Sequence, residues 1–221
     1  MKFSKRSGLI ATLFAGITAA SMAGAAVLEQ PAQKPREAAP KAKIGQKAPD
    51  FTLSDLDGKQ HSLKELQADD KIVVLEWFNP ECPFVVRHYD ESFDTMNKLA
   101  EEYKDDVVWV RINSNAEGQQ GSGIEKNKQY KESYRIEGPI LMDPGSEVAA
   151  LYGAQTTPHM YIIDAEGVLR YHGAIDDDVR GKNENRTNYV KQALDQILAG
   201  ETVTQTETRP YGCTVKYASK N

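Results

Sequence analysis

Cysteine is scarce in this sequence. Only two of the 221 residues are cysteines, Cys82 and Cys213. Two thiols are too few for a disulfide-scaffolded miniprotein or a zinc ribbon, and they allow one bridge or one reactive pair. A basic excess is also missing, because 27 lysines and arginines stand against 32 aspartates and glutamates. Nucleic acid is therefore not expected as a partner, since proteins that bind it usually carry surplus positive charge.

The N-terminus lacks the roughly 20 consecutive apolar residues that a membrane span needs. It has instead three basic residues within the first six, a shorter apolar stretch, and the small residues Ala23 and Ala25. This pattern predicts a cleaved signal peptide over residues 1–25 and an exported, for example periplasmic, protein. An uncleaved anchor is the alternative and the only expected membrane contact. Cleavage would change the net charge from −5 to −8, and an oxidising compartment would permit a disulfide.

The rest of the chain divides into three parts. Residues 26–43 hold three prolines among Ala, Lys, Gln and Glu, which is typical of an extended linker. One domain is predicted over residues 44–200. Residues 201–221 form a C-terminal tail, and its apolar and turn-forming side chains around residues 211–217 indicate that it folds back onto the domain.

The hydrophobic pattern predicts an α/β domain. Continuous apolar runs at residues 71–78 and 107–112 are typical of strands covered on both faces. Further strands are predicted at residues 50–53, 59–63, 159–164 and 168–172, and helices at 83–103, 124–134, 146–152 and 188–198. A βαβ unit that leads into a hairpin and a terminal helix predicts a mixed sheet with helices on both faces.

Cys82 is the main candidate for chemistry. It follows a predicted buried strand and precedes Pro83, which suits the first turn of a helix. The positive end of the helix dipole and free backbone N–H groups would favour the thiolate, which is the nucleophilic form. An inert buried cysteine is the alternative. The corner between a strand and a helix is where α/β folds place their sites, which favours a reactive Cys82.

Four motifs occur in the order and spacing of a known family. They cover residues 43–59, 77–84, 156–158 and 162–167. Together they resemble the redoxin and peroxiredoxin class (AhpC/TSA type) of thioredoxin-fold proteins, over roughly residues 44–200. Segments at 112–115, 176–177 and 212–216 further resemble a peroxiredoxin-like subgroup of exported bacterial proteins with a single cysteine at the active-site corner. The resemblance implies a thioredoxin-like fold.

The resemblance also implies roles for particular residues. Thr157 and Pro158 match a loop with a cis-proline, where the residue before the proline offers backbone groups to an extended substrate. Pro83 would lie beside the nucleophile and help to bind substrate. Glu76 stands six residues before Cys82, where thioredoxins carry a buried acid that can move protons. A glutamate that faces water or pairs with a lysine is the alternative.

The sequence also departs from the family pattern. Val85 occupies the second cysteine position of Cys-x-x-Cys, so a dithiol confined to this corner is excluded. Leu75 and Asn79 stand where typical peroxiredoxins have Pro and Thr. Cys213 is therefore the candidate partner of Cys82, as a resolving thiol or as part of a structural bridge, unless the two thiols are unrelated.

The predicted function is an exported thiol-based oxidoreductase. The Cys82 thiolate would attack a disulfide or a peroxide, and Cys213 or an external thiol reductant would resolve the product. A non-enzymatic binding module with a structural Cys82–Cys213 bridge is the alternative. No cofactor is expected. A metal site formed by Cys82, His88 and His159 is not expected either, because copper-delivering relatives of this fold use two cysteines at this corner.

Overall fold

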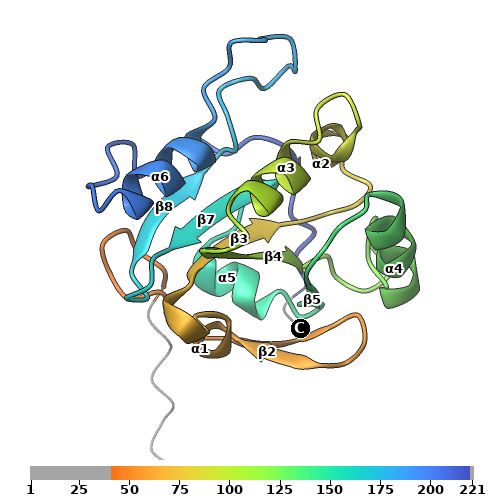
Figure 1. Ribbon diagram of the computed structural model, residues 1–221. Coiled ribbons are helices and arrows are strands. Elements are labelled where there is room, and N and C mark those ends of the chain that lie inside the picture. The colour runs from red at the N-terminus through yellow and green to blue at the C-terminus, as the bar shows by residue number, and fades with distance from the viewer. Residues whose placement is uncertain (1–40, 220–221) are drawn as a thin grey trace, which may run out of the picture. The chain divides into compact units, whose positions relative to one another are not determined.

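The computed structural model describes residues 41–219. The predicted signal peptide and most of the predicted linker lie outside these residues. A seven-stranded sheet has the order β2-β1-β5-β4-β3-β7-β8 (Figure 1). Its strands are β1 (Thr52–Asp55), β2 (Gln60–Ser62), β3 (Ile72–Trp77), β4 (Val107–Asn113), β5 (Ile140–Met142), β7 (His159–Ile163) and β8 (Leu169–Gly173). The helices are α1 (Leu63–Leu66), α2 (Pro83–Tyr89), α3 (Thr95–Glu102), α4 (Ile124–Ser133), α5 (Glu147–Tyr152) and α6 (Tyr189–Leu198), with a 3₁₀ turn at Ala68–Asp70.

Strand β3 lies inside the sheet and is buried along its whole length. It pairs parallel with β4 and antiparallel with β7. Because side chains alternate along a strand, Val74 packs into the core beneath α2, α3 and α6, whereas Val73 and Leu75 pack towards α1 and α5. Figure 1 shows these helices on opposite faces of the sheet. The predicted mixed sheet with helices on both faces is confirmed.

The helix predicted over residues 83–103 is wrong as one element, because it is two helices. The Asp90 carboxylate accepts hydrogen bonds from the Ser92 amide at 3.0 Å and the Ser92 hydroxyl at 2.5 Å. This local turn competes with helical hydrogen bonding. Asp94 then adopts a left-handed backbone with φ 41°. The chain therefore ends α2 at Tyr89 and begins α3 at Thr95 in a new direction.

Helix α1 and strand β5 are among the short elements that were not predicted. Helix α1 begins with a capping box, in which Ser62 accepts from the Glu65 amide and Glu65 accepts from the Ser62 amide. Strand β5 has only three residues and no alternation to reveal it. It exists because it pairs parallel with β4 on one side and antiparallel with β1 on the other, and such distant partners cannot be read from a local pattern.

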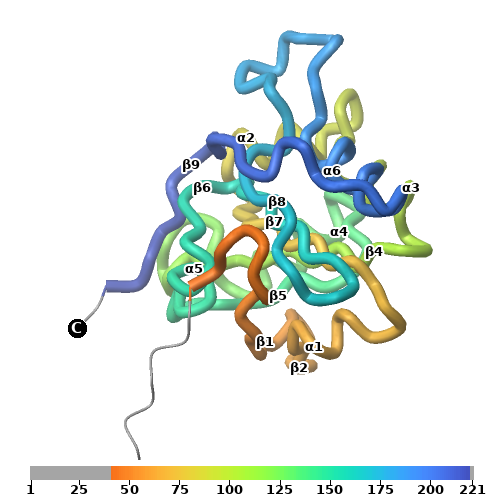
Figure 2. The backbone as a smooth tube through the Cα atoms, turned by 90° about the vertical axis from the view of Figure 1, so that its left-hand side faces the viewer, coloured from red at the N-terminus to blue at the C-terminus, as the bar shows by residue number. Residues whose placement is uncertain are grey.

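The C-terminal residues run back over the sheet. They first follow β8, where the His172 amide donates to the Thr206 carbonyl at 3.1 Å and the Thr208 amide donates to the His172 carbonyl at 3.2 Å. They then form strand β9 (Cys213–Thr214), which pairs with β6 (Thr156–Thr157) in a separate two-stranded sheet. Figure 2 shows this path from α6 across β8 to β9.

Membrane crossing by a helix would require a long apolar helix. Within residues 41–219, every helix is too short or too polar to cross a bilayer.

Candidate active site

Cys82 lies at the corner between β3 and α2. It is the residue that caps α2, and Pro83 is the first residue of that helix. Its amide donates to the Asn79 carbonyl at 3.0 Å, which fixes the tight turn after β3. The side chain is fully buried, and its sulfur donates to the Thr157 carbonyl at 2.9 Å. The sequence-predicted Cys82 and Thr157 are therefore in direct contact.

The bond between Thr157 and Pro158 is cis, as the resemblance implied. Pro158 separates the short strand β6 from β7, which is one of the neighbours of β3 in the sheet. Thr157 is almost completely buried and pairs with Cys213 across β6 and β9. Its hydroxyl also donates to the Cys213 carbonyl at 3.4 Å. One residue thus contacts both cysteines.

Cys213 lies next to Cys82, and both thiols are free in this structure. Burial, followed by a hydrogen bond to Cys82 and the charge of Cys82, raises the pKa of Cys213 to about 11, while Lys216 opposes the shift. Cys213 therefore keeps its proton at neutral pH and offers it to the Cys82 sulfur.

Glu76 is completely buried on β3, on the same face of the sheet as Phe78. Its carboxylate accepts from the Tyr89 hydroxyl at 2.8 Å and from the Trp109 indole at 3.0 Å, and it lies 3.5 Å from Nε of Arg111. Burial raises the pKa of Glu76, whereas Arg111, Trp109 and Tyr89 act to lower it. Glu76 is fully buried and its charged partner is an arginine, so it neither faces water nor pairs with a lysine.

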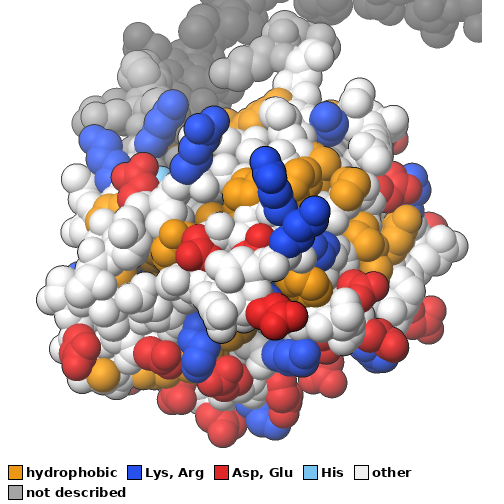
Figure 3. Space-filling model, turned by 90° about the horizontal axis from the view of Figure 1, so that it is seen from above, with side chains coloured by type: hydrophobic (Ala, Val, Ile, Leu, Met, Phe, Trp, Pro, Cys, Tyr) orange, Lys and Arg blue, Asp and Glu red, His pale blue; other side chains and the backbone are white. Residues whose placement is uncertain are grey.

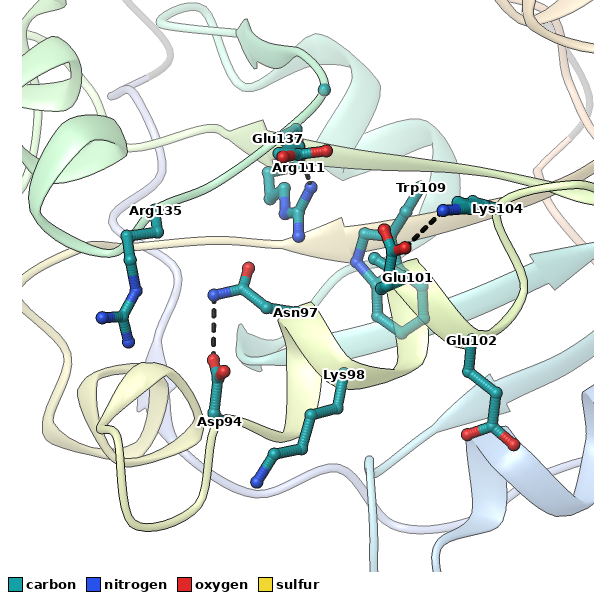
Figure 4. A pocket seen from close by; sticks show the side chains of 12 residues that line it. Asp94, Asn97, Lys98, Glu101, Glu102, Lys104, Trp109, Arg111, Arg135 and Glu137 are labelled. Atoms are coloured by element: carbon teal, nitrogen blue, oxygen red, sulfur yellow. Dashed lines mark hydrogen bonds and ion pairs between the residues drawn. The ribbon is translucent and has the colours of Figure 1, made fainter.

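Glu76 and Cys82 are not hydrogen-bonded to each other within the described residues. Arg111 extends from the Glu76 pair to a cavity of about 610 Å³ between α3 and β4. Figure 4 shows Arg111 and Trp109 among its lining side chains. The lining residues of this cavity do not include Cys82. The buried acid thus belongs to a network that supports the far end of α2 through Tyr89.

A polar cluster holds Tyr211 of the tail against α2. The Tyr211 hydroxyl donates to Oδ1 of Asp176 at 2.5 Å and lies 3.0 Å from Nε2 of His88. Arg87 donates to the same hydroxyl at 3.3 Å, and Arg186 pairs with Asp176 at 3.1 Å. Sequence analysis did not predict this cluster. Its only signals were the Asp176–Asp177 pair and the aromatic Tyr211.

This cluster predicts a loss of stability in acid. Burial, and then the positive charges of Arg87 and Arg186, lower the pKa of His88 to about 3, whereas an unfolded histidine has a pKa of about 6.5. Below about pH 6.5 the unfolded chain binds a proton that the folded chain excludes, so the free energy of unfolding falls as pH decreases. Between about pH 7 and pH 5, we expect the wild type to lose about 2 kcal/mol more than His88→Gln, measured by urea unfolding. Equal losses would contradict this account of His88.

Histidines do not gather at the cysteine corner. His88 faces Tyr211, while Nδ1 of His159 accepts from the Gln155 amide at 3.2 Å and lies 3.3 Å from the Tyr161 hydroxyl. In the part of the chain that the structure describes, no group of three or more His, Cys, Asp or Glu side chains is arranged to hold a metal ion.

The outer surface of α2 is open beside this buried centre. A shallow hollow of about 460 Å³ is lined by Pro83, Val86, Arg87, Asp90, Ser92 and Phe93. Val86 is exposed to 37 %. Figure 3 shows hydrophobic and basic side chains side by side on the face seen from above. Pro83, predicted to contact substrate, therefore lies at the rim of an accessible surface, whereas Cys82 beneath it is closed off.

Comparison with known proteins shows which proteins this chain is similar to. The model of the AhpC/TSA family matches residues 44–172. The thioredoxin-like protein YneN of Bacillus subtilis is 31% identical over 126 residues, which cover 57% of this chain and 68% of that protein. The thiol-disulfide oxidoreductase ResA of Bacillus anthracis is 28% identical over 127 residues, covering 58% and 67%.

A solved structure extends the similarity to most of the chain. The crystal structure of a hypothetical protein from Sinorhizobium meliloti is similar with a TM-score of 0.73 and 29% identity, covering 82% of this chain and 98% of that one. Membership of the narrower exported subgroup with one corner cysteine stays a prediction. The family match spans more than half of the sequence and includes the Cys82 corner and the Thr157–Pro158 loop. The chain belongs to the AhpC/TSA family.

Proposed function

We propose that this protein is a thiol–disulfide oxidoreductase whose working pair is Cys82 and Cys213. The observation that carries the proposal is the position of Thr157. Its carbonyl accepts the hydrogen bond from the Cys82 thiol, and its backbone pairs with Cys213 on β9. Two cysteines that are far apart in the sequence thus meet at one residue. The relative ResA, which is named a thiol-disulfide oxidoreductase, supports the same class of chemistry.

The proposed cycle has two exchange steps. The Cys82 thiolate attacks one sulfur of a substrate disulfide, the substrate S–S bond breaks, and the second substrate sulfur leaves as a thiolate that takes up a proton. Cys213 then loses its proton and attacks the Cys82 sulfur, which releases the first substrate sulfur as a thiol. The substrate gains two electrons and the protein gains a Cys82–Cys213 disulfide. An external dithiol, oxidised in turn to its disulfide, restores both thiols.

A peroxide would oxidise the same pair of cysteines. Attack of the Cys82 thiolate on the O–O bond gives a sulfenic acid and an alcohol or water, and condensation with the Cys213 thiol gives the disulfide and water. No basic side chain among residues 41–219 donates a hydrogen bond to the Cys82 sulfur. The disulfide is therefore the better supported substrate, because peroxide attack gains most from charge stabilisation near the reacting atoms.

The surrounding residues take supporting roles in this proposal. Thr157 and Pro158 position the chain of the substrate beside Cys82, and Pro83 contributes the rim of the site. Glu76 acts as a positioning residue rather than a proton carrier, because its hydrogen bonds hold Tyr89 at the end of α2 and do not reach Cys82. Export of the protein rests on the signal pattern of residues 1–25 alone.

A thiol titration tests the cycle. The purified protein is equilibrated in redox buffers and alkylated, and its intact mass counts the free thiols and shows whether residues 1–25 have been removed. We expect Cys82 and Cys213 to pair, with a midpoint above about −300 mV, as in working redox pairs. Cys213→Ser is the control that cannot form the bridge.

Other outcomes of the titration contradict the cycle. A bridge that resists reduction below about −300 mV indicates a structural bridge and favours the binding-module alternative. Thiols that never pair indicate an enzyme with one cysteine that depends on an external thiol. A mass that retains residues 1–25 after expression in an exporting host contradicts cleavage of the predicted signal.

A further inference from the structure

Residues 211–214 lie along the edge of β6, beside the cis bond between Thr157 and Pro158. Strand β9 pairs antiparallel with β6, which places Cys213 opposite Thr157 and Thr214 opposite Thr156. Addition of a strand to an exposed edge is a general way in which proteins recognise peptides, because the backbone supplies the hydrogen bonds and side-chain contacts supply the selectivity. In this structure, the added strand is β9 of the protein's own C-terminal tail.

The residue before Cys213 comes unusually close to this edge. Gly212 has a φ of +135°, and a Cβ atom on it would lie 2.1 Å from the Thr157 carbonyl oxygen and 3.2 Å from the Pro158 nitrogen. Both neighbours are backbone atoms, which cannot swing aside as the end of a long side chain can. Only glycine avoids this clash and also tolerates the positive φ. The edge of β6 therefore selects a glycine immediately before the cysteine.

The residue before that glycine is an aromatic anchor. The Tyr211 ring packs against Phe84 at 5.9 Å and His88 at 6.3 Å between ring centroids. Only 9 % of Tyr211 is exposed, and its hydroxyl donates to the buried Asp176. This recess combines an apolar wall with a fixed acceptor, which suits a phenol better than an aliphatic side chain.

We propose that the edge of β6 is a binding site for extended polypeptides that carry a glycine immediately before the reacting cysteine, preferably after an aromatic residue, and that residues 211–214 occupy it as a built-in copy of that ligand. The inference rests on the proposed function, since it names the substrate class that Cys82 would attack. Cys82 is fully buried while the tail is in place, so a polypeptide disulfide reaches it only by displacing the tail.

A binding experiment without any redox step tests the inference. The probe is a fluorescent peptide with the sequence Arg-Pro-Tyr-Gly-Ser-Thr-Val-Lys, in which serine replaces the cysteine of the tail, and binding to the full chain is followed by anisotropy. Tyr211→Ala should bind it at least about tenfold more tightly than the wild type, because the tail then competes less well. A matched peptide with alanine in place of glycine should bind at least about tenfold more weakly.

A second variant keeps the test decisive if Tyr211→Ala folds poorly. Gly212→Ala disfavours seating of the tail and leaves the edge of β6 unchanged, and it should also bind the glycine peptide more tightly. The inference is overturned if the glycine and alanine peptides bind equally, or if neither Tyr211→Ala nor Gly212→Ala binds the glycine peptide. Because no thiol of the peptide takes part, such a result leaves the Cys82–Cys213 cycle intact, and failure of the thiol titration leaves the binding result valid.

Discussion

Replacing Cys82 by serine is expected to lower turnover of a polypeptide disulfide by more than about a thousandfold, because the neighbouring Cys213 thiol keeps its proton at neutral pH and is a poor substitute nucleophile. Serine has nearly the same size as cysteine and is favoured at the N-cap position of a helix, so the fold should be retained. The measurement is the rate of substrate reduction in the presence of an external dithiol, beside a far-UV circular dichroism spectrum that checks folding.

Cys213→Ser is the matched control, since it removes the second sulfur and leaves the first. This variant should complete the first exchange step and stop there, with the substrate joined to Cys82 in a disulfide that intact-mass spectrometry detects. Turnover by Cys82→Ser within tenfold of the wild type would contradict the assignment of Cys82 as the nucleophile. A Cys213→Ser variant that accumulates no mixed disulfide and turns over normally would assign resolution to the external thiol.

Arg111→Met is expected to lower the free energy of unfolding by about 3–5 kcal/mol near neutral pH. The guanidinium donates to the Tyr89 hydroxyl at 3.0 Å and to the Glu137 carbonyl at 2.6 Å, and it is the positive partner of Glu76. Its removal leaves Glu76 as an uncompensated charge in the core. Urea unfolding followed by tryptophan fluorescence measures the loss, because Trp77 and Trp109 are buried.

The pH dependence identifies Glu76 as the cause. Burial already raises the pKa of Glu76 above its value in an unfolded chain, and loss of Arg111 removes the strongest of the interactions that lower this pKa. The folded chain then holds a proton that the unfolded chain releases, so the stability contributed by this group falls as pH rises through that window. The difference in the free energy of unfolding between the wild type and Arg111→Met should therefore be smaller at about pH 5 than at about pH 7.

A double variant serves as the control for the buried pair. Glu76→Gln together with Arg111→Met contains no buried charge at this position and should be more stable near neutral pH than Arg111→Met alone. Additive losses for the two substitutions, or a deficit that does not change with pH, would mean that Arg111 contributes mainly by packing against Trp109 and Tyr89.

The sequence predicted those parts of the fold that local patterns determine. Residues 71–78 and 107–112 are continuous apolar runs, and they became the central strands β3 and β4. The break between α2 and α3 was missed because the apolar spacing continues through Asp90 and Asp94, whose backbone geometry depends on a local turn. Strand β5 was missed because its hydrogen-bonding partners are distant in the sequence.

In the candidate site, too, local motifs predict some features, whereas contacts between distant residues could not be predicted. Cys82, Pro83 and the Thr157–Pro158 loop could be placed from motifs, because each lies at a characteristic junction of strand, loop and helix. The seating of Tyr211 could not, since its partners His88 and Asp176 are 123 and 35 positions away. Cys82 is completely buried beside Thr157 and Cys213, and this burial too could not be predicted from local patterns because both neighbours are distant in the sequence.

The two ends of the C-terminal segment cover different parts of the domain. Residues 206–208 pair with β8, whereas residues 213–214 pair with β6. Around Thr206 and Thr208 the segment pairs with His172 of β8, the last strand of the sheet. An uncovered outer strand offers free N–H and C=O groups to other chains and promotes aggregation. Release of Cys213 from β6 need not disturb that pairing. If a substrate displaces the tail as proposed, Cys82 would therefore become accessible while the β8 edge of the main sheet stays covered.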